Sequence, residues 1–127
     1  MGNGWCVLRK LIELWLEDLS TREAFSFRLC CGACGRDYAE KPRRFSKAGV
    51  MPQTREKQIL YEALYEQEFR DARQAAVRRA AEHLNFCPIC RQLVCNGCFL
   101  ICDELDMCSR CARQLHETGT PVLSGVF

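Results

Sequence analysis

Long apolar runs are missing from this chain of 127 residues, and histidine is scarce. No segment approaches the roughly 20 consecutive apolar residues of a membrane-spanning helix, so we expect no stable membrane insertion. The apolar stretch at residues 5–8 is followed at once by Arg9 and Lys10, which does not fit a secretory leader. Only two histidines occur, His83 and His116, and neither they nor any glutamate lies in a hydrolytic motif. We therefore expect no enzyme activity.

Charge of one sign is not in excess either. The 18 Lys and Arg residues against 16 Asp and Glu residues give a formal charge of +2 with neutral thiols. A zinc ion bound by four thiolates carries a net charge of −2, so two such sites would bring the metal-loaded chain to about −2. Binding to nucleic acid would therefore have to depend on a local basic patch.

Cysteine, in contrast, is abundant: the chain has eleven, and eight of them form four Cys-x-x-Cys pairs. Two residues between thiols let both sulfurs face one ion, and two pairs complete the four-thiolate shell that structural zinc prefers. The pattern predicts two zinc ions (Zn2+) per chain. The predicted ligands are Cys31, Cys34, Cys87, Cys90, Cys95, Cys98, Cys108 and Cys111.

Three cysteines fall outside these pairs. Cys6, Cys30 and Cys102 are interpreted as small buried apolar side chains. Cys30 and Cys102 lie near predicted ligands, and His116 follows Cys111 by five residues, so whether one of these three replaces a ligand stays open. An odd number of cysteines without a secretory leader favours a reducing, cytoplasmic compartment and no disulfides.

Two segments have helical periodicity. Over residues 5–19, apolar residues recur every three or four positions while charged residues fill the other side, which predicts an amphipathic helix. Residues 54–85 contain no Gly or Pro and carry one apolar stripe, which predicts a long helix. The stripe consists of Tyr61, Tyr65, Phe69, Ala72, Ala76, Ala80 and Leu84.

The whole chain, 1–127, is predicted to form one zinc-binding domain. Its fold class is α+β, mostly helical by residue count, with the long helix inserted into a small module that holds two zinc sites. The segments outside the helices are a strand and first zinc knuckle (25–35), a basic linker (36–53), a cysteine-rich zinc module (86–115) and an irregular tail (116–127).

The spacing of the cysteine pairs resembles that of FYVE-type fingers, which are cross-braced treble-clef zinc fingers whose second and third pairs are also separated by four residues. The resemblance covers the first pair and residues 87–111. It implies that pairs one and three share one ion and that pairs two and four share the other. The implied groups are Cys31, Cys34, Cys95 and Cys98, and Cys87, Cys90, Cys108 and Cys111.

The resemblance does not extend to phosphoinositide binding. FYVE-type fingers carry a basic, histidine-containing motif just before the second pair, where this chain has Ala81–Phe86. The first two pairs are also separated by 52 residues, more than in compact members of the family. Double zinc ribbons remain an equally fair comparison. Two other groupings stay open: a sequential one, with pairs one and two on one ion, and a nested one, with pairs two and three together.

These features favour a non-enzymatic adaptor or accessory subunit, in which zinc fixes a scaffold for protein-protein interaction. The N-terminal helix, the long helix or the tail would contact the protein partner, and a homo-oligomer stays open. The alternative is a nucleic-acid-binding zinc protein that uses the basic residues of 36–57, with Tyr38 and Phe45 available for stacking. Redox or catalytic-zinc chemistry is disfavoured, because a redox protein needs one Cys-x-x-Cys pair and catalytic zinc keeps an open coordination position.

Overall fold

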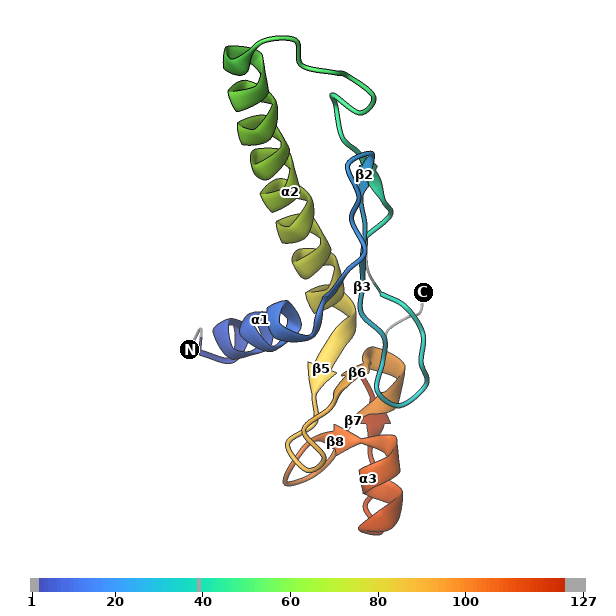
Figure 1. The fold of residues 1–127 in the computed structure, drawn as a ribbon. Helices are drawn as coiled ribbons and strands as arrows, with labels where there is room; N and C mark the ends of the chain where they lie inside the picture. The colour runs from blue at the N-terminus through green and yellow to red at the C-terminus, as the bar shows by residue number, and fades with distance from the viewer. Residues whose placement is uncertain (1–2, 39, 123–127) are drawn as a thin grey trace.

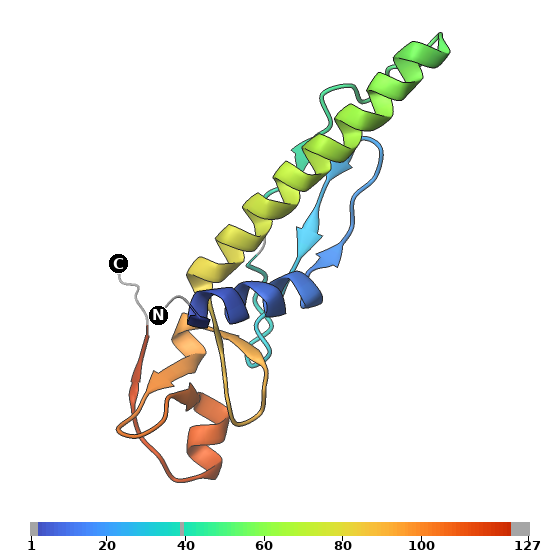
Figure 2. The same cartoon turned by 90° about the vertical axis from the view of Figure 1, so that its left-hand side faces the viewer.

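The structure is a computed structural model that describes residues 3–38 and 40–122, with side chains from residue 7 onward. The molecule is elongated (Figure 1). The long helix α2 (Arg55–His83) occupies one end, and the cysteine-rich module forms the other. Helix α1 (Asn3–Trp15) lies across the C-terminal end of α2, as Figure 2 shows from the side. Among the described residues, no helix is both long enough and apolar enough to cross a bilayer.

The remaining elements are short, and the fold is a mixture of helices and small antiparallel sheets. The sheets pair β1 with β3, β2 with β4, β5 with β6, and β7 with both β8 and β9. The three helices of the described residues cover 13, 29 and 6 residues, so helix is the commonest regular structure there without being the majority that we predicted. The other elements are β1 (Glu17–Asp18), β2 (Ala24–Phe25), β3 (Phe27–Arg28), β4 (Arg43–Arg44), β5 (Leu84–Phe86), β6 (Leu93–Cys95), the 3-10 turn η1 (Asn96–Cys98), β7 (Phe99–Ile101), β8 (Met107–Cys108), α3 (Ser109–Gln114) and β9 (Thr120–Pro121).

The N-terminal helix ends at Trp15, four residues before the predicted end at Leu19. Strand pairing explains the difference, because Glu17 and Asp18 pair with β3 and the Leu19 amide donates to the Ser26 carbonyl at 2.8 Å. The Arg73 guanidinium of α2 donates to the Glu13 carbonyl at 2.9 Å and so satisfies one of the last free carbonyls of α1. Contacts made later in the chain therefore set the end of this helix.

Helix α2 has a sharp start and a sharp end. The Thr54 hydroxyl accepts a hydrogen bond from the Lys57 amide at 3.1 Å, the standard N-cap arrangement. The prediction of helix through residue 85 is wrong by two residues, because Leu84 and Asn85 belong to β5 and pair with Cys95 and Val94 of β6. The helix thus leads directly into the strand that precedes the second cysteine pair.

Thr54→Ala is expected to lower the free energy of unfolding by about 1 kcal/mol, because it leaves the Lys57 amide without its capping acceptor. Urea unfolding followed by circular dichroism measures the change. Thr54→Ser keeps the hydroxyl and should retain most of the stability. Equal losses in the two variants would show that the cap does not stabilise α2.

Two hydrophobic clusters lie one after the other along α2. The first, called the aromatic cluster here, packs the β2 and β3 side chains and Phe45 against α2. Ring contacts bind it together; the Phe45 ring lies edge-on to the rings of Tyr61 and Tyr65, with centroid distances of 5.3 and 5.1 Å. Its buried members are Phe25, Phe27, Phe45, Ala72 and Ala76, with Tyr61, Tyr65 and Phe69 partly buried at its edge.

The second cluster, called the cysteine-rich cluster, fills the other end of the molecule. Val77 and Ala80 of α2 and Ile12 of α1 pack there against β5, β6 and the C-terminal module. Helix α1 thus covers the core with Ile12 and with the partly buried Leu8, Leu11 and Leu16. Besides cysteines and the residues named above, its buried members are Leu29, Leu84, Leu93, Val94, Phe99, Met107 and Ala112.

Candidate metal centres

The eight predicted ligands lie in two groups of four. Within each group one sulfur from every cysteine lies within 4.8 Å of the other three, and among residues 3–38 and 40–122 no other Cys, His, Asp or Glu side chains meet in this way. The grouping is interleaved, as the resemblance implied, and is neither sequential nor nested. The first group consists of Cys31, Cys34, Cys95 and Cys98, and the second of Cys87, Cys90, Cys108 and Cys111.

The sulfur–sulfur distances fit a shared metal ion. Cys34 and Cys95 sulfurs are 3.8 Å apart in the first group, and in the second Cys90 and Cys108 are 3.8 Å apart. A tetrahedral ion with metal–sulfur bonds of about 2.3 Å would hold its sulfurs about 3.8 Å apart, whereas a disulfide needs about 2.05 Å. No disulfide occurs among the cysteines whose side chains are described. The donor set and its spacing therefore suit two metal ions.

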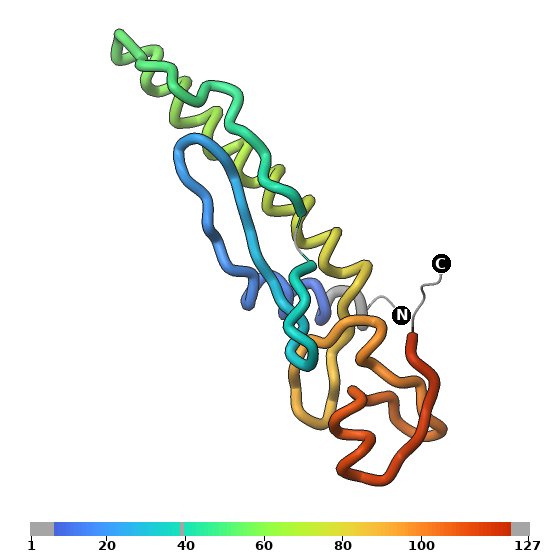
Figure 3. Tube along the Cα trace, turned by 90° about the vertical axis from the view of Figure 1, so that its right-hand side faces the viewer, coloured from blue at the N-terminus to red at the C-terminus, as the bar shows by residue number. Residues whose placement is uncertain are grey.

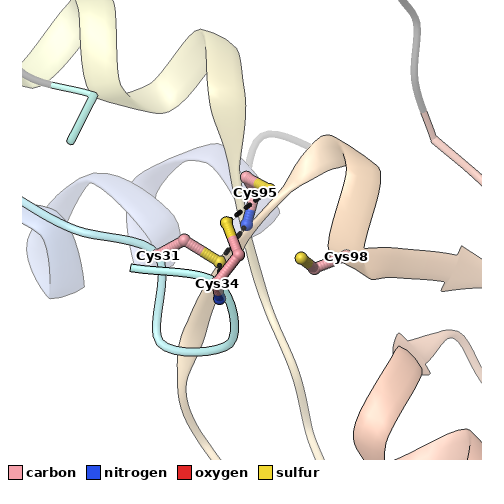
Figure 4. Close-up of side chains that lie close together, drawn as sticks. All are labelled: Cys31, Cys34, Cys95 and Cys98. Carbon is pink, nitrogen blue, oxygen red and sulfur yellow. Dashed lines mark hydrogen bonds between the residues drawn. The ribbon is translucent and has the colours of Figure 1, made fainter. Parts of the chain in front are cut away.

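The first group joins segments that are far apart in the sequence. The loop of Cys31 and Cys34 reaches β6 from the N-terminal half of the chain (Figure 3). There the Gly32 amide donates to the Leu93 carbonyl at 2.7 Å. Figure 4 shows the sulfurs of Cys31, Cys34 and Cys95 close together, with Cys98 facing them from the turn after β6.

The two groups are built in the same way. Each begins with a knuckle in which a backbone amide donates back to the first cysteine's carbonyl: Gly35 to Cys31 at 2.9 Å, and Arg91 to Cys87 at 2.8 Å. Both donors have positive φ, 81° at Gly35 and 61° at Arg91. The first suits glycine, while the second places a residue with a Cβ in the left-handed region.

The second half of each group is a cysteine that precedes a helical turn. Cys95 is the N-cap of η1, and Cys108 is the N-cap of α3. In each case the amide of that cysteine donates to the first sulfur of the knuckle, at 3.2 Å from Cys95 to Cys31 and at 3.3 Å from Cys108 to Cys87. A knuckle and a helical turn thus contribute two sulfurs each.

Backbone amides favour the anionic form of one sulfur in each group. Burial alone would raise the pKa of Cys31, but the amides of Cys34, Cys95 and Ala33 outweigh it and lower the pKa to about 6. The same balance lowers the pKa of Cys87 to about 7. Because metals bind the thiolate, the protein presents one prepared ligand in each group.

Burial differs between the groups. In the second group Cys87 and Cys108 have no exposed surface and Cys90 is partly buried, whereas in the first group Cys34 is exposed. The groups also contact each other, because the Arg110 guanidinium of α3 donates to the Gly32 carbonyl of the first knuckle at 3.2 Å. The second group is therefore the more enclosed of two neighbouring centres.

Tyr38 supports the first group, a role that sequence reasoning missed. Burial and a hydrogen bond to the Cys95 sulfur raise the pKa of Tyr38 to about 12. Its ring stacks on His83, with 5.3 Å between ring centroids. His83 thus covers one face of the half-buried Tyr38 ring, and the availability of Tyr38 for stacking on nucleic acid stays a prediction. No signal in the sequence links Tyr38 to Cys95.

Tyr38→Phe is expected to weaken metal binding by the first group by about 10- to 100-fold, since outer hydrogen bonds orient metal ligands. Competition with a chromophoric chelator measures the affinity of each site. Tyr61→Phe makes the same chemical change in the aromatic cluster and should leave both affinities unaltered. If Tyr38→Phe and Tyr61→Phe bound metal in the first group with the same affinity, the assigned role of Tyr38 would be wrong.

The other candidate ligands lie outside both groups. Cys30 is partly buried and accepts a hydrogen bond from Arg28 at 3.4 Å, while the Cys102 amide bonds to Asp106 at 3.0 Å. His116 is exposed and follows the end of α3 with a φ of 59°. The side chain of Cys6 and residues 123–127 of the predicted tail lie outside the described part of the chain.

The basic segment 36–57 does not offer Phe45 for the stacking that we predicted. Phe45 is fully buried in the aromatic cluster, so its expected availability for stacking is wrong. Arg43 and Arg44 form β4, and the Arg43 guanidinium lies 3.5 Å from the Glu40 carboxylate. The segment is a structural part of the domain rather than a linker.

Comparison with protein-family models, curated proteins and solved structures finds no match to this chain. The assignment of the two groups therefore depends on their own geometry.

Proposed function

We propose that this chain is a non-enzymatic, zinc-stabilised adaptor or accessory subunit. The observation that carries the proposal is the completeness of both centres, with four cysteines in each and no fifth candidate ligand beside them among the described residues. A catalytic zinc site has three protein ligands and one open position, whereas four thiolates fill the tetrahedral shell. Zinc is the metal that this all-sulfur donor set favours in a structural site.

The proposed class of fold is a cross-braced pair of treble-clef-like units. In this type of finger a knuckle supplies two ligands and the start of a helix supplies the other two. The second group follows that plan with the knuckle at Cys87, the β7–β8 hairpin and the start of α3. The first group follows it with the knuckle at Cys31 and the shorter turn η1. The shared construction supports this class over a simple double ribbon.

Elemental analysis and native mass spectrometry test the metal assignment, with two zinc ions per chain as the expected result. Zinc-bound thiols should also resist an alkylating reagent until a chelator is added. Rapid alkylation of the zinc-loaded chain would argue instead for thiol chemistry. A folded, metal-free protein after exhaustive chelation would remove the proposal.

A further inference from the structure

The end of α2 farthest from the cysteines carries an apolar groove of about 350 Å³. The loop that precedes α2 folds back beside the first turns of the helix (Figure 1). Side chains from the loop and from the helix line the groove. Large apolar side chains stay open to solvent there, with Met51 76% exposed and Leu60 68% exposed. The lining includes Lys47, Val50, Met51, Lys57, Leu60 and Leu64.

The loop is fixed on both sides of the groove. On one side Phe45 is buried, and the Ser46 amide donates to the Glu68 carboxylate of α2 at 3.0 Å. On the other side Thr54 caps the helix. Between them the Val50 amide closes a turn on the Lys47 carbonyl at 3.0 Å. The groove is thus formed before any ligand arrives, which lowers the entropic cost of binding.

The charge of the groove has one sign. Lys47 and Lys57 are its only charged residues, and no carboxylate belongs to its lining. Neither lysine forms an ion pair within the described residues. An apolar side chain of a ligand would lose its contact with water in the groove, which favours binding. Carboxylates next to that side chain would form ion pairs with the ammonium groups of Lys47 and Lys57.

We propose that this groove binds a short segment of a partner protein in which an apolar side chain is flanked by Asp or Glu. The inference rests on the adaptor function proposed above and names the surface that would serve it. Leu60, Leu64 and Val50 would contact the apolar side chain. Lys47 and Lys57 would pair with the carboxylates and orient the segment.

Two other occupants fit less well. The chain itself has an acidic segment with exposed apolar residues, Ile101 and Leu105 around Asp103 and Glu104, in the opposite end of the molecule. Ile101 pairs with Thr120 of β9, and the Cys102 amide donates to the Asp106 carboxylate, so this turn is fixed in its sheet and is not free to enter a groove as an extended segment. A membrane surface is too broad to enter a groove of this size, whereas a single projecting side chain fits it.

Selection of a random dodecapeptide phage library on the zinc-loaded chain tests the proposal. Enriched peptides should share an apolar residue with Asp or Glu nearby. Synthetic versions should bind at least tenfold more weakly to the Lys47→Glu and Lys57→Glu double variant and should weaken as salt rises. A Lys10→Glu and Lys41→Glu double variant has the same charge change at exposed sites outside the groove and should bind normally.

Several results would overturn the assignment. One is the absence of enriched peptides, and another is a set of peptides that bind the two double variants equally well. A third is self-association of the parent chain that rises with concentration in sedimentation and that the Lys47→Glu and Lys57→Glu variant alone has lost. Binding to phosphatidylserine vesicles that the groove variant loses, without any peptide enriched, would also overturn it. A chain that holds two zinc ions and binds a partner through another face would leave the adaptor function intact while the groove assignment fails.

Discussion

Cys108→Ser is expected to remove one of two zinc ions and to unfold the cysteine-rich module. Cys108 has no exposed surface, lies 3.8 Å from the Cys90 sulfur and donates its amide to the Cys87 sulfur. Structural zinc contributes roughly 10 kcal/mol or more to folding in small domains, a large amount beside a typical total stability of about 5–15 kcal/mol. The apolar side chains around this group could not compensate for its loss.

Native mass spectrometry should show one zinc ion in this variant, and amide exchange should become fast from β5 to α3. Cys102→Ser is the matched control, because Cys102 is a partly buried cysteine outside both groups. It should keep two zinc ions and near-normal protection. If Cys108→Ser kept two ions and melted like the parent protein, the ligand assignment of the second group would be wrong.

Phe45→Ala is expected to destabilise the protein by about 3–5 kcal/mol while leaving the zinc content at two. The Phe45 ring is fully buried and touches the rings of Phe25, Tyr61 and Tyr65. Its removal leaves a cavity in a cluster that contains no cysteine. The lost stability therefore comes from packing, and metal binding is unaffected. Denaturant unfolding and elemental analysis measure the two effects separately.

Phe45→Leu serves as the control, since it keeps most of the apolar volume and should cost clearly less than the alanine variant. A stability loss below about 1 kcal/mol in Phe45→Ala would mean that the ring is not packed as described. Loss of zinc in the same variant would mean that the aromatic cluster and the metal centres fold as one unit.

The ligand set was predictable because its signal is local. Cys-x-x-Cys spacing reflects how a knuckle turns two sulfurs toward one ion, and that geometry needs no information from elsewhere in the chain. The long helix was predictable for a similar reason, since its apolar stripe and lack of Gly and Pro extend over many turns. Spacing alone left the grouping of the pairs open, and only the family resemblance favoured the interleaved arrangement that the structure has.

The errors come from residues whose environment is set by distant partners. Phe45 stands in a basic stretch and has no local pattern that marks it as buried, but Tyr61 and Tyr65 from the next helix enclose it. The role of Tyr38 was missed for the same reason, because Tyr38 interacts with Cys95, a residue much later in the chain. Leu84 continues the helical stripe in sequence, yet pairing with β6 holds it in a strand. In each case tertiary contacts outweigh local preference.

The interleaved grouping has a consequence for biosynthesis. Among the eight ligands a growing chain presents Cys31 and Cys34 first and then Cys87 and Cys90, so the first four ligand thiols belong to different finished centres. An ion captured by these four thiols would hold an incorrect set and would have to exchange ligands before either centre could form. Correct metallation of this protein therefore requires either late metal delivery or ligand exchange.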